Sequence, residues 1–341
     1  EFRTLGICDA NSEADDFYSR GRKEQITTPA VFNKGKIITF IIMKFELTVL
    51  GSSSATPTAE RNPSAQVLNC DDRLFLIDCG EGTQMQMRKF KIKFQRIDHI
   101  FISHLHGDHY LGLAGLLFTY HLLGRTKELH VYANAALHKI IKLQLAASET
   151  SLLYPLVFHE LPENKSAILY DDDKIGVNCF PLLHRVPTHG FVFRQKFTER
   201  NIIKEKIAEL EIPLEELSAI KKGADFTDKK GRKHPNTELT FELPPAKMFA
   251  YCSDTGFSQK IVPYIKNASL LYHEATFMQD MQASADAKQH STTINAATIA
   301  KKAQANKLLI GHFSARYDEL TNVLEETRSV FPDADLAIEG N

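Results

Sequence analysis

Residues 103–112 read SHLHGDHYLG and contain a His-x-His-x-Asp-His run formed by His104, His106, Asp108 and His109. A strand-like stretch precedes this run, and an apolar stretch with helical spacing follows it. Alternate side chains of an extended segment face the same side, so His104 and His106 point together while the other two fall where the helix begins. Imidazole and carboxylate groups in this arrangement can converge on two adjacent metal positions, whereas the alternative is a polar loop that binds no metal.

Two metal ions need more than four ligands, and three further candidates stand at the ends of strand-like stretches. His184 follows VNCFPLL, Asp254 follows KMFAYCS, and His312 follows KLLIG. Each alone is more typical of a capped loop or a core histidine, but their shared placement predicts that they meet the histidine run at one sheet edge. Two ions roughly 3.5–4 Å apart can hold a water and a phosphoryl or carbonyl oxygen together, so the pattern predicts a hydrolase.

Strand-like and helix-like stretches alternate from residue 45 onward, which predicts an α/β fold with one insertion. The insertion covers about 194–242, where the strand period disappears. Within it, the segment 221–234 has a net charge of +4, six basic residues against two acidic ones. The basic residues are Lys221, Lys222, Lys229, Lys230, Arg232 and Lys233. The segment is either a phosphate-contacting patch or ordinary solvated surface, and the charge run alone favours the second interpretation.

The composition restricts the remaining possibilities. A formal net charge of -1 over 341 residues produces no field that would draw a polyanion to the whole molecule. Five cysteines without a Cys-x-x-Cys pair indicate reduced thiols and a cytoplasmic protein. No apolar stretch approaches the roughly 20 residues of a membrane helix. Residues 1–42 show no steady apolar period and end before Met43, so they are either a native N-terminal tail or a segment that precedes the true start.

The motifs of the chain resemble those of the metallo-β-lactamase superfamily and, within it, the short form of the RNase Z family of tRNA 3′-processing endonucleases. The resemblance covers about 43–341 and rests on DCGEGTQ (78–84), SHLHGDH (103–109), LLHRVPTHGF (182–191), YCSDT (251–255), HEATF (273–277), HST (290–292) and GHFSARY (311–317). HEATF, HST and FSARY are the motifs specific to the narrower family. The implied fold is a four-layer αβ/βα sandwich of the α/β class, with a protruding arm at the insertion.

The resemblance also implies a site with two zinc ions per subunit, held between the sheet edges. The implied ligands of one zinc are His104, His106 and His184, and those of the other are Asp108, His109 and His312. Asp254 would bridge the two ions. Asp78 would steady the histidine loop from behind the ligands, as carboxylates commonly do around zinc. Manganese or iron is an alternative, because imidazole and carboxylate ligands accept all three metals.

The implied reaction removes the 3′ trailer from precursor tRNA, leaving a 3′-hydroxyl on the tRNA and a 5′-phosphate on the trailer. Asp108 would orient the attacking water or accept its proton. The resemblance assigns protonation of the leaving ribose oxygen to His273, with Glu274 holding the imidazole, and places His290 near the phosphate or the trailer. The arm would bind tRNA through its lysine-rich segment, often across a homodimer. We expect no organic cofactor and no membrane association.

Two other functions remain open at this stage. A thioesterase, a lactonase or a general phosphodiesterase on the same fold would use the same ions but would not need the arm. The other possibility is an RNA-binding protein that has the same fold but has lost its catalytic residues. The presence of all seven implied ligands argues against it.

Overall fold

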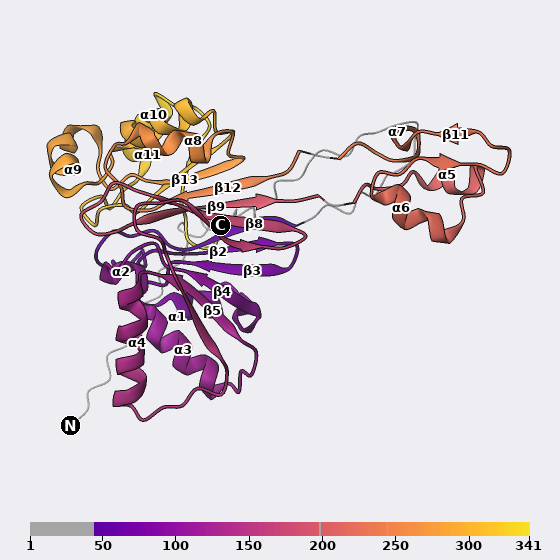
Figure 1. Ribbon diagram of the computed structural model, residues 1–341. Helices are drawn as coiled ribbons and strands as arrows, with labels where there is room; N and C mark the ends of the chain where they lie inside the picture. The colour runs from indigo at the N-terminus through magenta and orange to yellow at the C-terminus, as the bar shows by residue number, and fades with distance from the viewer. Residues whose placement is uncertain (1–43, 198, 244) are drawn as a thin grey trace, which may run out of the picture.

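The computed structural model describes residues 44–341 apart from 198 and 244, so the prediction about residues 1–42 lies outside the described part of the chain. Two β-sheets pack face to face, and helices cover the outer side of each sheet (Figure 1). The predicted α/β class and the four-layer αβ/βα arrangement are therefore confirmed. No helix among the described residues has the length and apolar character needed to cross a membrane.

The first sheet has six strands in the order β1-β2-β3-β4-β5-β6. These are β1 (Phe45–Gly51), β2 (Ala65–Cys70), β3 (Arg73–Ile77), β4 (Ile97–Phe101), β5 (Leu129–Ala133) and β6 (Leu156–Glu160). Pairing is antiparallel from β1 to β3 and parallel from β3 to β6. The helices on its outer face are α1 (Thr83–Lys89), α3 (Gly112–Leu122) and α4 (Ala135–Ala147).

The second sheet has seven strands in the order β15-β14-β13-β12-β9-β8-β7. These are β7 (Ala167–Asp171), β8 (Ile175–Pro181), β9 (His189–Gln195), β12 (Met248–Cys252), β13 (Leu270–Glu274), β14 (Leu308–Gly311) and β15 (Ala334–Leu336). Strands β12 to β15 are mutually parallel, and β7, β8 and β9 form an antiparallel meander beside them. The helices on this side are α8 (Val262–Ile265), α9 (Gln282–Lys288), α10 (Thr293–Ala303) and α11 (Thr321–Arg328).

Aromatic side chains fill the space between the two sheets. Phe75 and Phe101 come from the first sheet, Phe193 and Phe249 come from the second, and all four are at most 1% exposed. The ring centroids of Phe101 and Phe193 lie 5.5 Å apart at an interplanar angle of 84°. Edge-to-face pairs of this kind contribute about 0.5–1.5 kcal/mol beyond the burial of apolar area. The core therefore fixes how one sheet sits on the other, which matters for a site that draws ligands from both.

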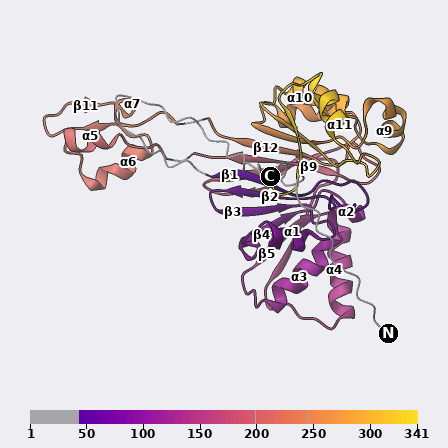
Figure 2. The same ribbon diagram turned by 180° about the vertical axis from the view of Figure 1, so that it is seen from behind.

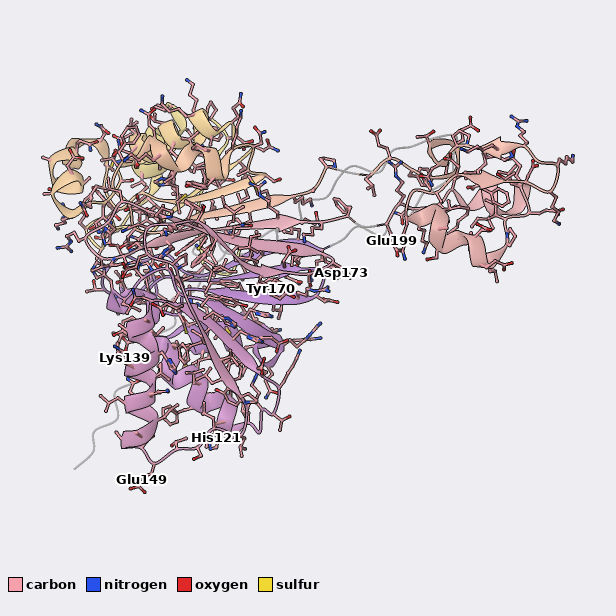
Figure 3. All side chains as sticks on the ribbon, viewed as in Figure 1. His121, Lys139, Glu149, Tyr170, Asp173 and Glu199 are labelled. Carbon is pink, nitrogen blue, oxygen red and sulfur yellow. The ribbon has the colours of Figure 1, made fainter. Side chains whose placement is uncertain are left out.

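The insertion forms an arm that stands away from the sandwich (Figures 1 and 2). Its elements are α5 (Lys204–Glu209), α6 (Leu217–Lys221), β10 (Phe226–Thr227), β11 (Lys233–His234) and α7 (Asn236–Leu239). They enclose a small apolar core of their own, made of Ile212, Ile220, Phe226 and Leu239. Figure 3 marks Glu199 where the linking chain meets this arm. The arm leaves after the carboxyl end of β9 and returns at the amino end of β12.

Candidate metal and catalytic site

The predicted ligands all follow the carboxyl ends of strands, and these ends meet at one edge of the sandwich. The histidine run follows β4 and continues into α2 (Gly107–Tyr110), whereas His184, Asp254 and His312 follow β8, β12 and β14. The edge of an open α/β sheet outside the carboxyl ends of its strands is the usual place for a ligand. Because Asp254 follows the carboxyl end of β12 and the arm joins its amino end, the site and the arm lie at opposite ends of this strand.

One group of ligand atoms comes from His104, His106, His184 and Asp254, whose ligand atoms all lie within 4.8 Å of one another. The His106 Nδ1 atom lies 3.1 Å from His104 Nε2 and 3.2 Å from His184 Nε2. Two nitrogens that bind one tetrahedral zinc at 2.0–2.1 Å lie about 3.3 Å apart. Burial and the nearby His109 lower the pKa of His104 to about 4, which keeps its imidazole neutral and able to bind a cation.

A second group comes from Asp108, His109 and His312. The Nε2 atoms of His109 and His312 lie 3.3 Å apart, and the Oδ2 atom of Asp108 lies 3.3 Å from His312 Nε2. Asp254 lies between the two groups, with Oδ2 3.4 Å from His104 Nε2 and Oδ1 3.2 Å from His312 Nε2. The buried Oδ1 atom of Asp254 has no hydrogen-bond donor among the described residues. A cation between the groups would satisfy this oxygen, so the residues fit a pair of metal ions.

The nitrogens that face away from the ligand groups are held by other residues. His109 donates from Nδ1 to the Asp78 carboxylate at 2.8 Å, and His184 donates from Nδ1 to the Gln289 carbonyl at 2.9 Å. The Nδ1 atom of His312 lies 2.8 Å from the hydroxyl oxygen of Thr276. A partner on one ring nitrogen fixes the tautomer, so the lone pair on the other nitrogen points into the site.

Asp78 lies behind the candidate ligands and ties the two sheets together there. Its carboxylate accepts hydrogen bonds from the Ser103 amide at 2.7 Å and from the Tyr251 hydroxyl at 2.6 Å. Tyr251 belongs to β12 of the second sheet, and its hydroxyl was not singled out from the sequence. The Ser103 hydroxyl lies 2.9 Å from the Ser253 hydroxyl, a second link across the sheets. These buried contacts fix the position of His109 relative to Asp254.

Asp108 has a fixed orientation in the second ligand group. Its Oδ2 atom accepts a hydrogen bond from the Ala55 amide at 2.7 Å. Burial alone would raise the pKa of the Asp108 carboxyl, but the facing His109 and His312 imidazoles hold that pKa well below its ordinary value. The carboxylate is therefore ionised across the neutral pH range. Ala55 and His312 have φ angles of 61° and 60°, a strained conformation for residues with a side chain that is often found at functional sites.

Glu274 and His290 form a buried acid–base pair beside the ligands. The His290 Nδ1 atom donates to the Glu274 carboxylate at 2.8 Å, and the Glu274 carboxylate also accepts from the amides of Thr255 and Thr276. Burial alone lowers the pKa of His290, but the Glu274 carboxylate outweighs burial and raises that pKa to about 9. The imidazole lies 4.0 Å from Asp254, at the edge of the ligand groups. His290 is therefore a protonated group at the edge of the candidate ligand groups, and it forms a third group of possible ligand atoms with Asp254 and His312.

His273 lies differently from the arrangement that the sequence suggested. Side chains alternate along β13, so His273 shares a face with Leu271, which packs in the helix-covered core, while Glu274 points toward the ligands. The His273 Nδ1 atom donates to the backbone carbonyl of Glu274 at 2.7 Å, and no described contact joins its imidazole to the Glu274 carboxylate. Burial lowers the pKa of His273, so the imidazole is neutral. The structure thus brings Glu274 to His290 and not to His273.

The basic residues of the arm differ in whether a carboxylate neutralises them. Lys229 pairs with Glu211 at 2.6 Å, and Lys233 pairs with Asp225 at 3.0 Å. The other four make no ion pair with a described residue and are exposed: Lys221, Lys222, Lys230 and Arg232. Asp228 shapes the turn between β10 and β11, because its carboxylate accepts from the amides of Lys230 and Arg232 at 2.8 and 3.0 Å.

Comparisons with known proteins agree with this geometry. The ribonuclease Z of Bacteroides thetaiotaomicron is 45% identical over 296 residues, which cover 87% of this chain and 94% of that protein. The ribonuclease Z of Porphyromonas gingivalis is 43% identical and covers 84% of this chain and 94% of its own length. The crystal structure of human tRNase Z, short form, matches with a TM-score of 0.63 and 30% identity over 86% of this chain and 97% of that chain.

More distant matches share the fold. The metallo-β-lactamase fold protein YhfI from Bacillus subtilis covers 86% of this chain and 96% of its own chain, with a TM-score of 0.62 and 18% identity. A family model described as anti-Pycsar protein Apyc1 matches residues 45–161, about the first sheet and the histidine run. The similarity to the two bacterial ribonucleases extends over most of this chain and nearly the whole of each of them. The chain has the metallo-β-lactamase fold and belongs to the ribonuclease Z family.

Proposed function

We propose that the protein is a metal-dependent endoribonuclease that removes the 3′ trailer from precursor tRNA. The observation that carries this proposal is the combination of two adjoining ligand groups with a protonated histidine, His290, at their edge. Hydrolysis of a phosphodiester needs charge stabilisation at phosphorus, an activated water and an acid for the leaving oxygen. The products are a tRNA with a 3′-hydroxyl and a trailer with a 5′-phosphate.

The two ligand groups would hold two zinc ions, with Asp254 between them. Imidazole and carboxylate ligands also accept manganese or iron, so the metal in the cell is set in part by availability. When bound, the ions would stabilise negative charge on the phosphoryl oxygens and acidify the attacking water. Asp78, Thr276 and the Gln289 carbonyl hold the ligand imidazoles in place for this purpose.

Asp108 positions the attacking water and accepts its proton. The carboxylate is ionised and is kept in one orientation by the Ala55 amide. A general base needs to be within hydrogen-bond reach of the proton that it takes. Asp108 meets this requirement for a water held between the two ligand groups.

His290 protonates the departing ribose 3′ oxygen. Its Nδ1–H group is engaged by Glu274, so the Nε2–H group is left to donate. Glu274 keeps the imidazole protonated in the ground state and stabilises its position through two further backbone contacts. This assignment replaces His273 with His290 as the acid, and Glu274, which the sequence analysis assigned to the His273 imidazole, holds the imidazole of His290 instead.

The arm binds the body of the tRNA, and the active form is a homodimer. The arm and its own metal site lie at opposite ends of β12, so an RNA that contacts the arm reaches a partner's site more readily than the site of the same chain. Large apolar side chains are exposed on the helices below the first sheet, including Met85 at 68%, Leu122 at 80% and Leu143 at 71%. Exposed apolar side chains of this kind are available for a contact between subunits.

Precursor tRNA is the partner, and the cytoplasm, where tRNA is processed, is the proposed location. The four described cysteines are free and buried, as expected of thiols in a reducing compartment. A hydrolase for thioesters, lactones or small phosphodiesters on the same fold is the competing function. It would not need an arm with four exposed, unpaired cations among the described residues.

The test compares a 3′-extended precursor tRNA with an unstructured RNA of the same length, using protein loaded with zinc. We expect metal-dependent cleavage of the folded precursor at one position, with much slower cutting of the unstructured RNA. Replacing the arm residues 200–241 by a short flexible linker is expected to raise KM for the precursor while hydrolysis of a small phosphodiester persists. Equal rates on both RNAs, or an arm deletion without effect, would refute the tRNA assignment.

A further inference from the structure

A hollow of about 470 Å³ opens beside the ligands, and no ligand has been assigned to it above. Its lining includes Leu183, Phe257, Gln282, Asp286, Gln289 and Asn295. Two of these residues are sequence neighbours of site residues. Leu183 precedes the candidate ligand His184, and Gln289 precedes His290. A molecule in the hollow therefore lies next to the groups that act on the phosphoryl centre.

The walls of the hollow are joined to one another by hydrogen bonds. The Gly256 amide donates to the Leu183 carbonyl at 2.8 Å, and the His184 imidazole donates to the Gln289 carbonyl at 2.9 Å. The Ser291 hydroxyl donates to the Thr255 carbonyl at 2.7 Å. Because these bonds connect the loops after β8 and β12 with the loop before α10, the hollow has a preformed shape. A preformed site costs little conformational entropy when a ligand enters it.

The chemistry of the walls is divided into an apolar part and a polar part. Phe257 is 36% exposed and Leu183 is 46% exposed, so each presents apolar surface to the hollow. The α9 side supplies Gln282 and Asp286, whose side chains are joined by a 2.7 Å hydrogen bond, and Asn295 adds an amide from α10. A flat molecule with apolar faces and a hydrogen-bonding edge suits these walls. Nucleobases have this form, and proteins bind unpaired bases by stacking them on aromatic rings.

We propose that the hollow binds the base of the nucleotide whose ribose 3′ oxygen is released, stacked on the ring of Phe257. The inference rests on the proposed function, because it takes His290 as the acid that protonates this oxygen. The released oxygen must lie within hydrogen-bond reach of His290, so the ribose that carries it stands beside Gln289. The base on that ribose then enters the hollow. The first trailer nucleotide is attached through its 5′ oxygen, which His290 does not protonate, and its base lies elsewhere.

Two precursor tRNAs test this inference, one unmodified and one with an abasic nucleotide immediately before the cleaved bond. Wild type, Phe257→Ala and Phe257→Tyr are compared on both RNAs by kcat/KM. We expect Phe257→Ala to lower kcat/KM roughly tenfold on the unmodified RNA, the effect typical of losing one stacked base. On the abasic RNA the same substitution is expected to cost less than twofold, because the stacking partner is already absent. Phe257→Tyr retains the ring and is expected to stay near wild type on both.

An equal loss from Phe257→Ala on both RNAs, or no loss on either, would overturn the inference. A third precursor with an abasic first trailer nucleotide separates the two sides of the cut, and a loss that disappears only on this RNA would assign the hollow to the trailer instead. Metal content and thermal unfolding of Phe257→Ala check that the fold is intact. Failure of the proposed function looks different, because wild type itself would then leave the unmodified precursor uncut.

Discussion

The pair formed by Glu274 and His290 gives the sharpest prediction, which concerns the pH dependence of cleavage. The carboxylate of Glu274 lies 2.8 Å from His290 Nδ1 and raises the pKa of His290 from 6.5 to about 9. Glu274→Gln keeps a side chain of nearly the same shape but removes the negative charge. The pKa of His290 is then expected to fall to 6.5 or below, because burial continues to lower it.

The size of the effect follows from the requirement that a general acid must be protonated. An acid with a pKa of about 9 is roughly 90% protonated at pH 8, whereas an acid with a pKa of about 6.5 is roughly 3% protonated, so the rate at pH 8 should fall about 30-fold. At pH 5.5 both forms are largely protonated, and the two rates should approach each other. Bound metal ions would lower the pKa of His290 by the same amount in wild type and in Glu274→Gln. The quantity to compare is therefore the separation between the pH–rate profiles of the two proteins.

The assay is the single-turnover rate of precursor cleavage with saturating enzyme, measured from pH 5.5 to pH 9.5. Asp98→Asn serves as a matched control, because Asp98 is a carboxylate of the same protein that pairs with Arg125 on the first sheet, at the other end of β4 from the histidine run. The descending limb of Glu274→Gln should lie about 2.5 pH units or more below that of wild type and of Asp98→Asn. A limb that stays in place would refute the role of His290 as the acid and the role of Glu274 as its partner.

Three further predictions follow from the site and the arm. Tyr251→Phe removes the hydroxyl that holds Asp78 and should weaken zinc binding roughly tenfold in a chelator competition. Tyr272→Phe is the control and should leave zinc binding unchanged, because it removes a buried hydroxyl that makes no described hydrogen bond to Asp78 or to a candidate ligand. Replacing Lys230 and Arg232 together by Ala should raise KM, leave kcat unchanged and reduce by about two the slope of log binding constant against log salt concentration. A change in kcat alone would contradict this prediction. His273→Ala should lower the free energy of unfolding by about 2 kcal/mol without moving the pH profile of cleavage, and a shifted profile would return the acid role to His273.

The convergence of the candidate ligands at one edge could be predicted because its signal is local. His104, His106, Asp108 and His109 lie within six residues just after β4, and the other three candidate ligands each follow a recognisable strand. Carboxyl ends of neighbouring parallel strands lie at one edge, so strand order brings such residues together without detailed knowledge of packing. The expected strands at the edge match β4, β8, β12 and β14 to within a few residues.

The acid could not be assigned in the same way, because the contact that decides it is not local. Glu274 and His290 are sixteen residues apart, and α9 and a left-handed Gln289 with φ of 54° return the chain to the site. Adjacency of His273 and Glu274 in the sequence suggested a contact that strand alternation forbids, since neighbouring side chains of β13 face opposite sides. Counting the alternation from the apolar Leu271 would have separated the two roles.

Contacts between the sheets were also beyond reach from the sequence. Tyr251 and Asp78 are 173 positions apart, and the hydroxyl meets the carboxylate only because the two sheets pack at one distance. In the arm, the run of cations predicts a basic surface but not which of them are neutralised. Glu211 and Asp225 reach Lys229 and Lys233 through the folded hairpin and helices, which the charge pattern does not reveal.

The most direct test of the central claim is to map the products of cleavage in water enriched in oxygen-18. The zinc-loaded protein is incubated with a 3′-extended precursor tRNA, and both product ends are analysed by mass. We predict one cut, a tRNA with an unlabelled 3′-hydroxyl, and a trailer whose 5′-phosphate carries one heavy oxygen. A 2′,3′-cyclic phosphate on the tRNA, label in the tRNA, or an intact precursor beside a hydrolysed small ester would contradict the account.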